Sequence, residues 1–298
     1  MSDAPANPRA TPIEIIRRRV RLAYDAAAAR AWTRLPRVSE DGLNAISFLF
    51  PVGEAFFCRS VAYYRGRITD PALREAADQF IHQEANHSRE HARSNAALRE
   101  ANVLGAELET VARIMLGIAK TIWPRATQLS ITCALEHFTA ILASLLLRKR
   151  LLYREGTDPA FANLWLWHAA EEIEHKAVCF DVYEHVFGRG FWAWMHRIFG
   201  LVVVTVTGAI GLMIAFSVMR VKLFFRPRRA VKSAEGGASP SGPSLRNLFG
   251  TPPVSAYTAY FRRDFHPWDE DDRDLLEAWK QEHPGFGLPD HHHHRAPA

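Results

Sequence analysis

The sequence predicts an all-α protein built on a four-helix bundle, and three observations support this fold class. Long stretches with apolar residues at helical spacing fill much of the 298-residue chain. Two of these stretches carry a Glu-x-x-His motif, whose two side chains share one helix face. Each motif follows a single glutamate on an earlier stretch, and a bundle that holds two metal ions presents its ligands in this way. In chain order, these residues are Glu54, Glu84, His87, Glu136, Glu172 and His175.

The composition suits a globular protein with a substantial core, since 48% of the residues are hydrophobic and 23% are charged. The three cysteines, Cys58, Cys133 and Cys179, form no close pair, so we expect neither a disulfide framework nor a cysteine-rich zinc site. Much of the net charge of +5 lies near one hydrophobic segment, which argues against nucleic acid as a partner. The N-terminus lacks the apolar core of a signal peptide, so the bundle is expected to be cytoplasmic.

Helix start and stop signals define the first elements of the chain. Residues 13–32 have the pattern of an amphipathic helix ahead of the bundle. The first bundle helix is expected over residues 39–65, with Ser39 as its N-cap. Pro51 predicts a kink in this helix just before Glu54.

An Asp-Pro pair opens both Glu-x-x-His helices, because aspartate caps a first turn and proline suits the first helical position. The second bundle helix therefore starts at Asp70-Pro71 and the fourth at Asp158-Pro159. Between them, a connecting helix ends at Pro124, and Gly156 stops the third bundle helix. The expected ranges of these four helices are 71–98, 106–123, 124–152 and 159–187.

Residues 198–219 are a run of 22 residues without a charge. As a helix, this run would be about 33 Å long, which is enough to cross the hydrocarbon core of a bilayer. Basic residues follow it, and one span from a cytoplasmic bundle would place them outside, against the positive-inside tendency. We therefore expect a re-entrant or in-plane helix that associates with the inner membrane. A buried bundle helix is the alternative.

These features divide the chain into five parts. The bundle is expected over residues 13–190, followed by the hydrophobic, membrane-associated helix over 191–226. A stretch rich in Gly, Ser and Pro predicts a flexible linker over 227–245. An aromatic and helical segment over 246–284 is expected to dock back on the protein. Residues 285–298, which include four consecutive histidines, are expected to form a disordered tail outside the site.

The six Glu and His residues form a coherent set of metal ligands. Glu54 and Glu136 would come from the first and third bundle helices, and the Glu-x-x-His pairs would supply the other four. Glu136 lies in an apolar run, where a glutamate needs a cation or a partner. Carboxylate and imidazole ligands suit iron or manganese. We expect two metal ions, with iron in first place and manganese or zinc as alternatives; surface ion pairs are the competing interpretation.

His168 extends the second motif. It lies four residues before Glu172 on the same helix face, which gives the pattern His-x-x-x-Glu-x-x-His. This pattern resembles the di-iron N-oxygenases, in which a third histidine joins the usual six ligands. The resemblance implies that His168 is a seventh ligand, and a supporting role beside the ligands is the alternative.

Three further side chains are candidates for supporting roles. His91 and His137 would hold the ligands in place or pack in the core. Glu171 is the neighbour of Glu172, and it would either compete with Glu172 for the metal or orient His175.

Five segments carry a likeness to a known family. They resemble the bacterial family described as predicted metal-dependent hydrolases, and the likeness extends from about residue 13 to residue 283. It implies a ferritin-like metal protein, and the family description implies hydrolysis. The segments are Gly53–Phe57, Phe80–His91, Leu135–His137, His168–Lys176 and Phe265–Trp268.

Two reactions suit a dinuclear centre of this kind. Iron with O2 would oxidise a substrate, with an electron donor as partner, whereas metal-activated water would hydrolyse one. Ligands that line a helix bundle favour oxidation. We therefore expect O2-dependent oxidation of a small apolar or lipid-like substrate, with hydrolysis as the alternative. A non-catalytic, membrane-associated metal-binding protein is the second alternative.

Overall fold

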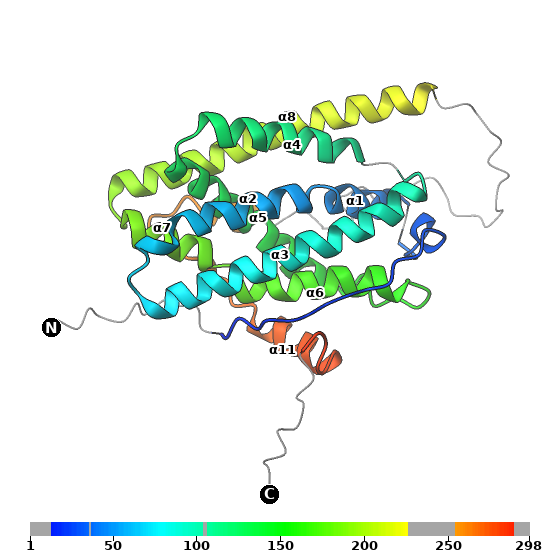
Figure 1. Cartoon of the computed structure of the whole chain (residues 1–298), viewed down its shortest axis with the longest axis horizontal. Coiled ribbons are helices and arrows are strands. Elements are labelled where there is room, and N and C mark those ends of the chain that lie inside the picture. Colours follow the sequence, from blue (N-terminus) through cyan, green and yellow to red (C-terminus); the bar gives the residue numbers. More distant parts are fainter. Residues whose placement is uncertain (1–12, 36, 104–105, 226–253, 289–298) are drawn as a thin grey trace, which may run out of the picture.

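A computed structural model describes residues 13–35, 37–103, 106–225 and 254–288 (Figure 1). Regular structure in these residues is helical, which confirms the predicted all-α fold class. Short 3-10 turns lie at Ala28–Arg30, Arg65–Arg67 and Pro267–Asp269. The α-helices are α1 (Arg37–Ser47), α2 (Phe50–Tyr64), α3 (Pro71–Glu100), α4 (Ala106–Ile122), α5 (Arg125–Lys149), α6 (Pro159–His175), α7 (Val178–Phe187), α8 (Phe191–Phe225), α10 (Val254–Ala259) and α11 (Arg273–Glu282).

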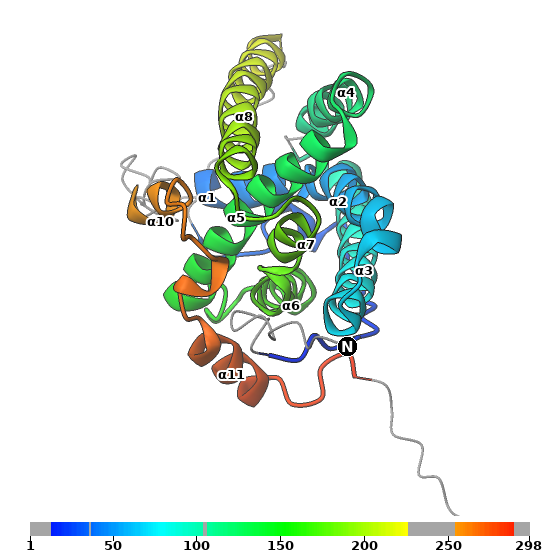
Figure 2. The ribbon, with the colours of Figure 1, turned by 90° about the vertical axis from the view of Figure 1, so that its left-hand side faces the viewer.

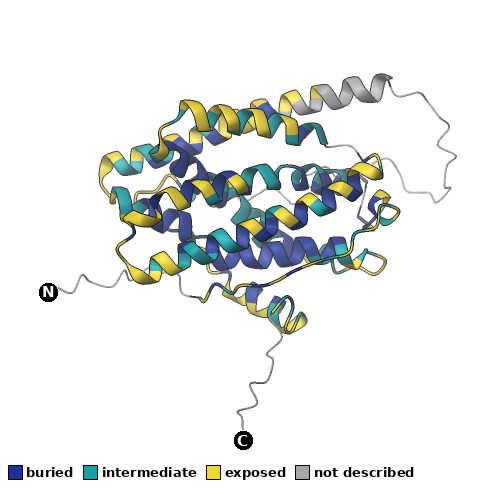
Figure 3. Cartoon of the chain, viewed as in Figure 1, coloured by how far each residue is buried: buried dark blue, intermediate teal, exposed yellow. Residues whose placement is uncertain are grey.

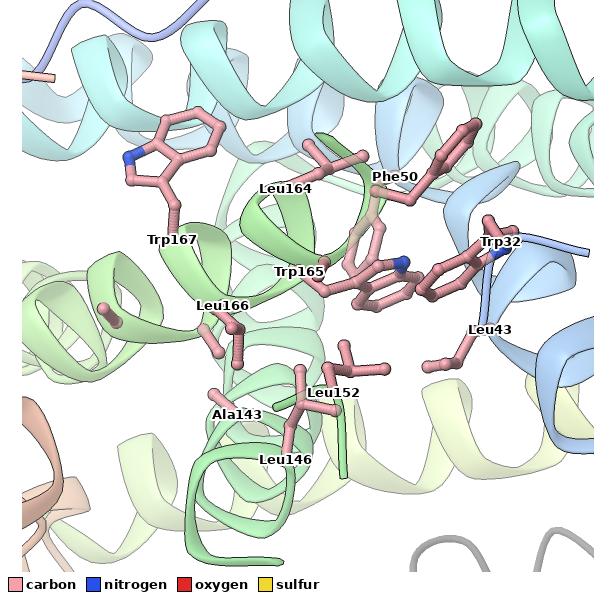
Figure 4. Close-up of a cluster of buried hydrophobic side chains, with 14 of the residues drawn as sticks. Trp32, Leu43, Phe50, Ala143, Leu146, Leu152, Leu164, Trp165, Leu166 and Trp167 are labelled. Carbon is pink, nitrogen blue, oxygen red and sulfur yellow. The ribbon is translucent and has the colours of Figure 1, made fainter. Parts of the chain in front are cut away.

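Four helices form the bundle. α2 packs along α3 and α5, and α6 packs along the same two helices, so the four enclose one core (Figure 2). An apolar cluster with Trp32, Phe50 and Trp165 fills one end of this core (Figure 4). A second cluster, with Phe80 and Phe180, fills the other end. In α2, α3 and α5 the predicted ligands fall between residues of one cluster and residues of the other, so they lie in the middle of the bundle. In α6 they lie among and just after residues of the first cluster, and the second cluster resumes on α7.

Asp70 and Asp158 cap the two Glu-x-x-His helices, as the sequence predicts. Each carboxylate accepts hydrogen bonds from two backbone N–H groups of the first turn, and proline occupies the first helical position. A cap of this kind stabilises a helix by about 1 kcal/mol. The caps fix where α3 and α6 begin and therefore which face of each helix carries the Glu-x-x-His motif.

The first and fourth bundle helices are both divided. α1 and α2 meet at an angle of 41°, just before Pro51, where the sequence predicts a kink. α1 begins at Arg37 rather than at Ser39. The fourth helix ends at His175 and resumes as α7. Lys176 in this break is buried and pairs with Asp272 at a distance of 2.8 Å, which ties the break to the C-terminal segment.

The amphipathic helix predicted over residues 13–32 is not formed. Apart from turns near residues 26–30, residues 13–35 have no regular secondary structure, and they run along α3 and α6 (Figure 1). Polar side chains of α3 bind the backbone of this N-terminal segment; for example, Gln83 donates a hydrogen bond to the carbonyl of Ile16. These bonds give several backbone groups of the segment the partners that a helix would otherwise supply.

Arg18 anchors the N-terminal segment. Its side chain is buried, and its guanidinium lies 2.9 Å from a carboxylate oxygen of Glu171 and 2.6 Å from one of Glu174. A buried charge is tolerated when it is paired and hydrogen-bonded. Tertiary pairing of Arg18, together with the hydrogen bonds from α3, therefore outweighs the helical pattern of the segment.

α4 and α8 form an outer layer over α2 and α5 (Figures 1 and 2). In the described part of the chain, two helices are long and apolar enough to cross a membrane: α5, and the stretch Phe191–Gly211 of α8. The bent α1–α2 pair would add a third if it is counted as one broken span. α5 is mostly buried inside the bundle, whereas the α8 stretch is mostly exposed (Figure 3).

The C-terminal residues 254–288 pack against the bundle. Tyr260, Phe265 and Trp279 are buried in these contacts. α11 lies against α5 and α6, on the side of the bundle away from α8 (Figure 1). The predicted linker over residues 227–245 and residues 289–298 of the predicted tail lie outside the described residues.

Candidate metal centre

The four bundle helices bring the predicted ligands together in the middle of the core. Glu54 comes from α2, the first Glu-x-x-His pair from α3, Glu136 from α5, and the second pair with His168 from α6. All seven side chains are buried. Because the two members of each motif are three residues apart, one helix face points both of them inward.

His175 lies among three carboxylates. Its Nε2 atom is 3.0 Å from Glu84 Oε1, 3.5 Å from Glu172 Oε2 and 3.6 Å from Glu136 Oε2. These carboxylates come from three different helices. The second Glu-x-x-His motif therefore meets the first motif and the lone glutamate of α5 at one point.

His87 and His168 complete the cluster from the other side. His87 Nδ1 is 3.5 Å from Glu84 Oε1. His168 Nε2 is 2.8 Å from Glu172 Oε1 and 3.7 Å from Glu54 Oε1. The two imidazole rings stack, with centroids 4.0 Å apart.

Many polar atoms of the cluster are buried without a hydrogen-bond partner. A buried polar group without a partner costs about 1–3 kcal/mol, and a charged one costs more. Orphaned atoms of this kind that converge on one place are suited to bind a cation. The orphaned atoms are both carboxylate oxygens of Glu54, Glu84 and Glu136, the Nδ1 atom of His87 and the Nε2 atom of His175.

The carboxylates also destabilise one another's charges. Burial, followed by the charges of Glu84, Glu172 and Glu136, raises the pKa of Glu54 well above its ordinary value. Burial, followed by the charges of Glu172 and Glu84, does the same to the pKa of Glu136. Protons or metal ions must therefore neutralise the cluster.

Glu171 holds the ring of His87. Its Oε2 atom accepts a hydrogen bond of 2.9 Å from His87 Nε2, and its other oxygen pairs with Arg18. Burial opposes the charged form of His87, but the hydrogen bond to Glu171 and the nearby charge of Glu84 raise its pKa to about 9. The expectation that Glu171 orients His175 or competes with Glu172 is therefore corrected. Since Nε2 is engaged, His87 presents Nδ1 to the cluster.

Gln83 holds the ring of His175, and sequence reasoning missed it. Its amide oxygen is 2.8 Å from His175 Nδ1, and its amide nitrogen donates to Glu174. With Nδ1 engaged, the orphaned Nε2 atom faces the carboxylates. Thr139, which donates a hydrogen bond of 2.6 Å to Glu172 Oε2, was also missed. Its position three residues after Glu136 was the available signal, since both lie on one face of α5.

A chain of hydrogen bonds fixes the orientation of the His168 ring. Ser47 donates to Asn95, so its oxygen is free to accept from His91 Nδ1 at 2.8 Å. Burial, followed by the charges of His168 and His87, lowers the pKa of His91 well below its ordinary value, so this ring is neutral. Its Nε2 atom then accepts from His168 Nδ1 at 2.7 Å. With Nδ1 engaged, His168 directs its Nε2 atom toward the cluster, where it lies 2.8 Å from Glu172 Oε1.

His137 points away from the cluster. It is bonded to the carbonyl of Ala256 on α10 at 3.0 Å, and its ring lies 4.9 Å from that of Tyr260. Of the three predicted supporting residues, the structure therefore places His91 and Glu171 beside the ligands and His137 in a separate aromatic contact.

The donor atoms fit a metal site. Four groups of three side chains, taken from the described residues, each bring one donor atom per side chain to within 4.8 Å of the others. Glu136 belongs to no such group, although it lies near His175. Two of the groups share Glu84, and so suit neighbouring ions. The groups are Glu54/Glu84/His87, Glu84/Glu172/His175, His87/His168/Glu172 and Glu54/His91/His168.

Comparison with known proteins gives one match. No curated protein and no solved structure is significantly similar to the chain. The family model described as predicted metal-dependent hydrolase matches residues 16–271, which is most of the chain and includes all of the candidate ligands. The chain belongs to the predicted metal-dependent hydrolase family.

Proposed function

We propose that the protein is a di-iron enzyme that uses O2 to oxidise a small apolar or lipid-like substrate. The observation that carries this proposal is the set of orphaned carboxylate and imidazole atoms, which converges from four helices on the buried core. Carboxylate and imidazole donors without thiolates suit iron, with manganese or zinc as alternatives. A helix bundle with this ligand order is the setting of di-iron carboxylate proteins.

Two neighbouring ions would share the ligands. Glu54, Glu84 and His87 would hold one ion, and Glu84, Glu172 and His175 the other, with Glu136 beside the second. His168 is the proposed seventh ligand, because its Nε2 atom faces Glu54 and Glu172. Bound iron supplies the redox chemistry that activates O2, and an electron donor is the expected partner.

Aromatic side chains support oxidation over hydrolysis because they exclude water. Phe50 lies 4.4 Å from the His168 ring, Trp167 4.8 Å from His87, and Phe80 4.9 Å from His175, measured between ring centroids. Hydrolysis needs a supply of water at the metal. Oxidation benefits from a closed, apolar surround that confines reactive species.

Hydrolysis remains the second candidate, because the family description names it. It would use metal-activated water on an ester or amide. A non-catalytic metal-binding role is the third. For either enzyme, we propose a cytoplasmic bundle that associates with the inner membrane through residues 198–219, since the α8 stretch is apolar and mostly exposed.

The deciding experiment compares metal content and reactivity in one preparation. The purified chain is analysed for metals by mass spectrometry, loaded with iron without air, reduced chemically and then mixed with O2. We expect two iron ions per chain and O2 uptake that scales with the iron content. The control is the same protein after chelation, which should take up no O2.

Other outcomes assign the other candidates. Cleavage of ester or amide substrates without O2 uptake would replace the oxidase proposal with hydrolysis. Bound metal with neither reaction would leave a metal-binding protein. Absence of metal after loading would contradict all three.

A further inference from the structure

The outer layer of α4 and α8 is fixed tightly to the bundle. A Cβ atom built on Gly200 of α8 would lie only 2.7 Å from the backbone oxygen of Ser130 on α5. One built on Gly211 would lie 2.9 Å from the sulfur of Met115 on α4. The two glycines therefore allow α8 to approach both neighbours closely, and this part of α8 runs along the bundle instead of leaving it.

Most of the exposed large hydrophobic side chains lie on this outer layer. On α4, Ile114, Ile118 and Ile122 are spaced four residues apart and form one outward row. On α8, the exposed fraction of the Trp192 side chain reaches 80%. Large exposed apolar surfaces of this kind mark binding surfaces. The exposed side chains of α8 are Phe191, Trp192, Met195, Phe199, Val202, Val206, Ile210, Met213 and Ile214.

The remainder of the described surface has only scattered residues of this type. Among the described residues, the exposed large hydrophobic side chains outside α4 and α8 are Tyr63, Val254, Phe261 and Leu288. They lie on separate elements. The apolar surface is therefore one-sided, and it covers the side opposite α11 and the N-terminal segment (Figures 1 and 3).

A span across a bilayer does not suit this packing. If the stretch Phe191–Gly211 crossed a membrane, α4 and α5 would have to enter the bilayer with it. α4 carries Glu109, Arg113 and Lys120, which are costly in hydrocarbon. A helix that lies in the membrane plane immerses only one face and keeps its polar flank in water.

The charge beside the apolar face indicates which lipids it meets. α8 contains no Asp or Glu over its 35 residues. A groove of about 350 Å³ separates α4 from α2; Phe56 and Leu116 line it, together with Arg59, Arg113 and Lys120. Its single acid, Glu109, is already engaged by two arginines. Cationic edges on an apolar surface attract anionic lipid headgroups.

We propose that the outer face of α4 and α8 docks flat on an anionic lipid bilayer. The isoleucine row of α4 and the exposed apolar side chains of α8 enter the acyl boundary, and the α2–α4 groove meets the anionic headgroups. Trp192 lies at the membrane interface, where tryptophan is enriched. The docking extends the proposed membrane association of residues 198–219 and does not depend on the proposed reaction.

Vesicle flotation of the full-length, metal-loaded chain tests the apolar face. We expect the protein to float with phosphatidylcholine vesicles that contain phosphatidylglycerol, and binding to weaken as the salt concentration rises. The triple variant Ile114→Ser/Ile118→Ser/Ile122→Ser should lose at least about tenfold in vesicle affinity. Val254→Ser removes an equally exposed apolar side chain on α10, and it should bind as the wild type does.

A second pair of variants tests the charge. Arg59→Ala/Lys120→Ala should lower the affinity for the anionic vesicles about tenfold and leave the binding to neutral ones unchanged. Arg19→Ala, on the N-terminal segment at the opposite side of the bundle, should change neither the affinity for anionic vesicles nor the binding to neutral ones. Metal content is measured on the same samples and should stay at the wild-type value, so that a failure of the surface is distinguished from a failure of the metal centre.

Several outcomes would overturn the proposal. The proposal is wrong if the wild-type protein does not float with the anionic vesicles. It is also wrong if the isoleucine variant binds the vesicles as tightly as the wild type does. Retention on vesicles after an alkaline carbonate wash would indicate a span instead of in-plane docking. A dimer in light scattering that dissociates in the isoleucine variants would assign the face to a second copy of the chain.

Discussion

Glu84 links the two Glu-x-x-His motifs, because its carboxylate lies 3.5 Å from His87 and 3.0 Å from His175. Its two oxygens have no hydrogen-bond partner. A ligand in this position is shared by both halves of the centre. Loss of its charge should therefore affect both of the proposed ions, whereas loss of a ligand at the edge should affect one.

The variant Glu84→Gln keeps the size of the side chain and removes its charge. We expect less than half of the wild-type metal content, measured by mass spectrometry on folded protein. Glu90→Gln is the matched control, since Glu90 is equally buried on α3 but pairs with Arg93 outside the cluster. Equal metal content in the two variants would contradict the ligand role of Glu84.

His91 and His137 form a second matched pair. His91→Phe removes the acceptor that fixes the His168 ring, so metal affinity should fall about 10- to 100-fold. His137→Phe should leave the affinity unchanged, because His137 faces α10. Titration with a competing chelator measures both. If the two variants bind metal with equal affinity, the hydrogen-bond chain from Ser47 through His91 to His168 has no role in metal binding.

The sequence predicts single residues of the centre well when the signal is local. A Glu-x-x-His spacing places both side chains on one helix face whatever the helix packs against. The residues that hydrogen-bond the imidazole rings and orient them depend instead on how the helices pack. Gln83 reaches His175 from another helix, across a sequence separation of 92 residues, and no local pattern indicates such a contact.

At the scale of elements, the caps were predictable and the N-terminal segment was not. Asp70 and Asp158 bond to their own first turns, so the signal lies within a few residues. The extended form of residues 13–35 depends on partners in α3 and α6, and helical periodicity takes no account of them. The predicted kink at Pro51 again follows from a local cause.

Replacement of Arg18 tests how much this segment depends on one ion pair. Arg18→Met removes the buried guanidinium that pairs with both Glu171 and Glu174, so the free energy of unfolding should fall by about 3–5 kcal/mol. Arg19→Met, one residue on and exposed, should change it by less than about 0.5 kcal/mol. Urea denaturation gives both values. Similar values for the two variants would mean that the segment is held by its backbone bonds alone.

At the scale of the whole molecule, metal and fold are linked. The cluster buries carboxylates from α2, α3, α5 and α6 at one point, so a bound cation ties all four helices together. The fold class was predictable because this ligand order and the helical periodicity agree. The division of the surface into an apolar and a polar side could not be predicted from the sequence, because it depends on how α4 packs against α8.

Removal of metal should lower the stability of the entire bundle. A ligand present at a thousand times its dissociation constant stabilises the folded state by about 4 kcal/mol, which corresponds to about 10 °C in Tm for a domain of this size. Differential scanning calorimetry before and after chelation measures the change. Iron should restore the original Tm, and Mg²⁺ should not, because imidazole ligands disfavour it. An unchanged Tm after chelation would mean that metal binding does not stabilise the fold.

The pairing of Arg18 with Glu171 and Glu174 also has a consequence for biosynthesis. Arg18 leaves the ribosome first, and Glu171 follows 153 residues later. At ordinary translation speed, the delay is roughly 10–30 s. Throughout that interval α6 is not yet complete, so the N-terminal segment can form its contacts to α3 but not those to Glu171 and Glu174. Because His168, Glu172 and His175 emerge together with Glu171, we expect the ligand set and the N-terminal cover of the bundle to be completed at the same late stage of synthesis.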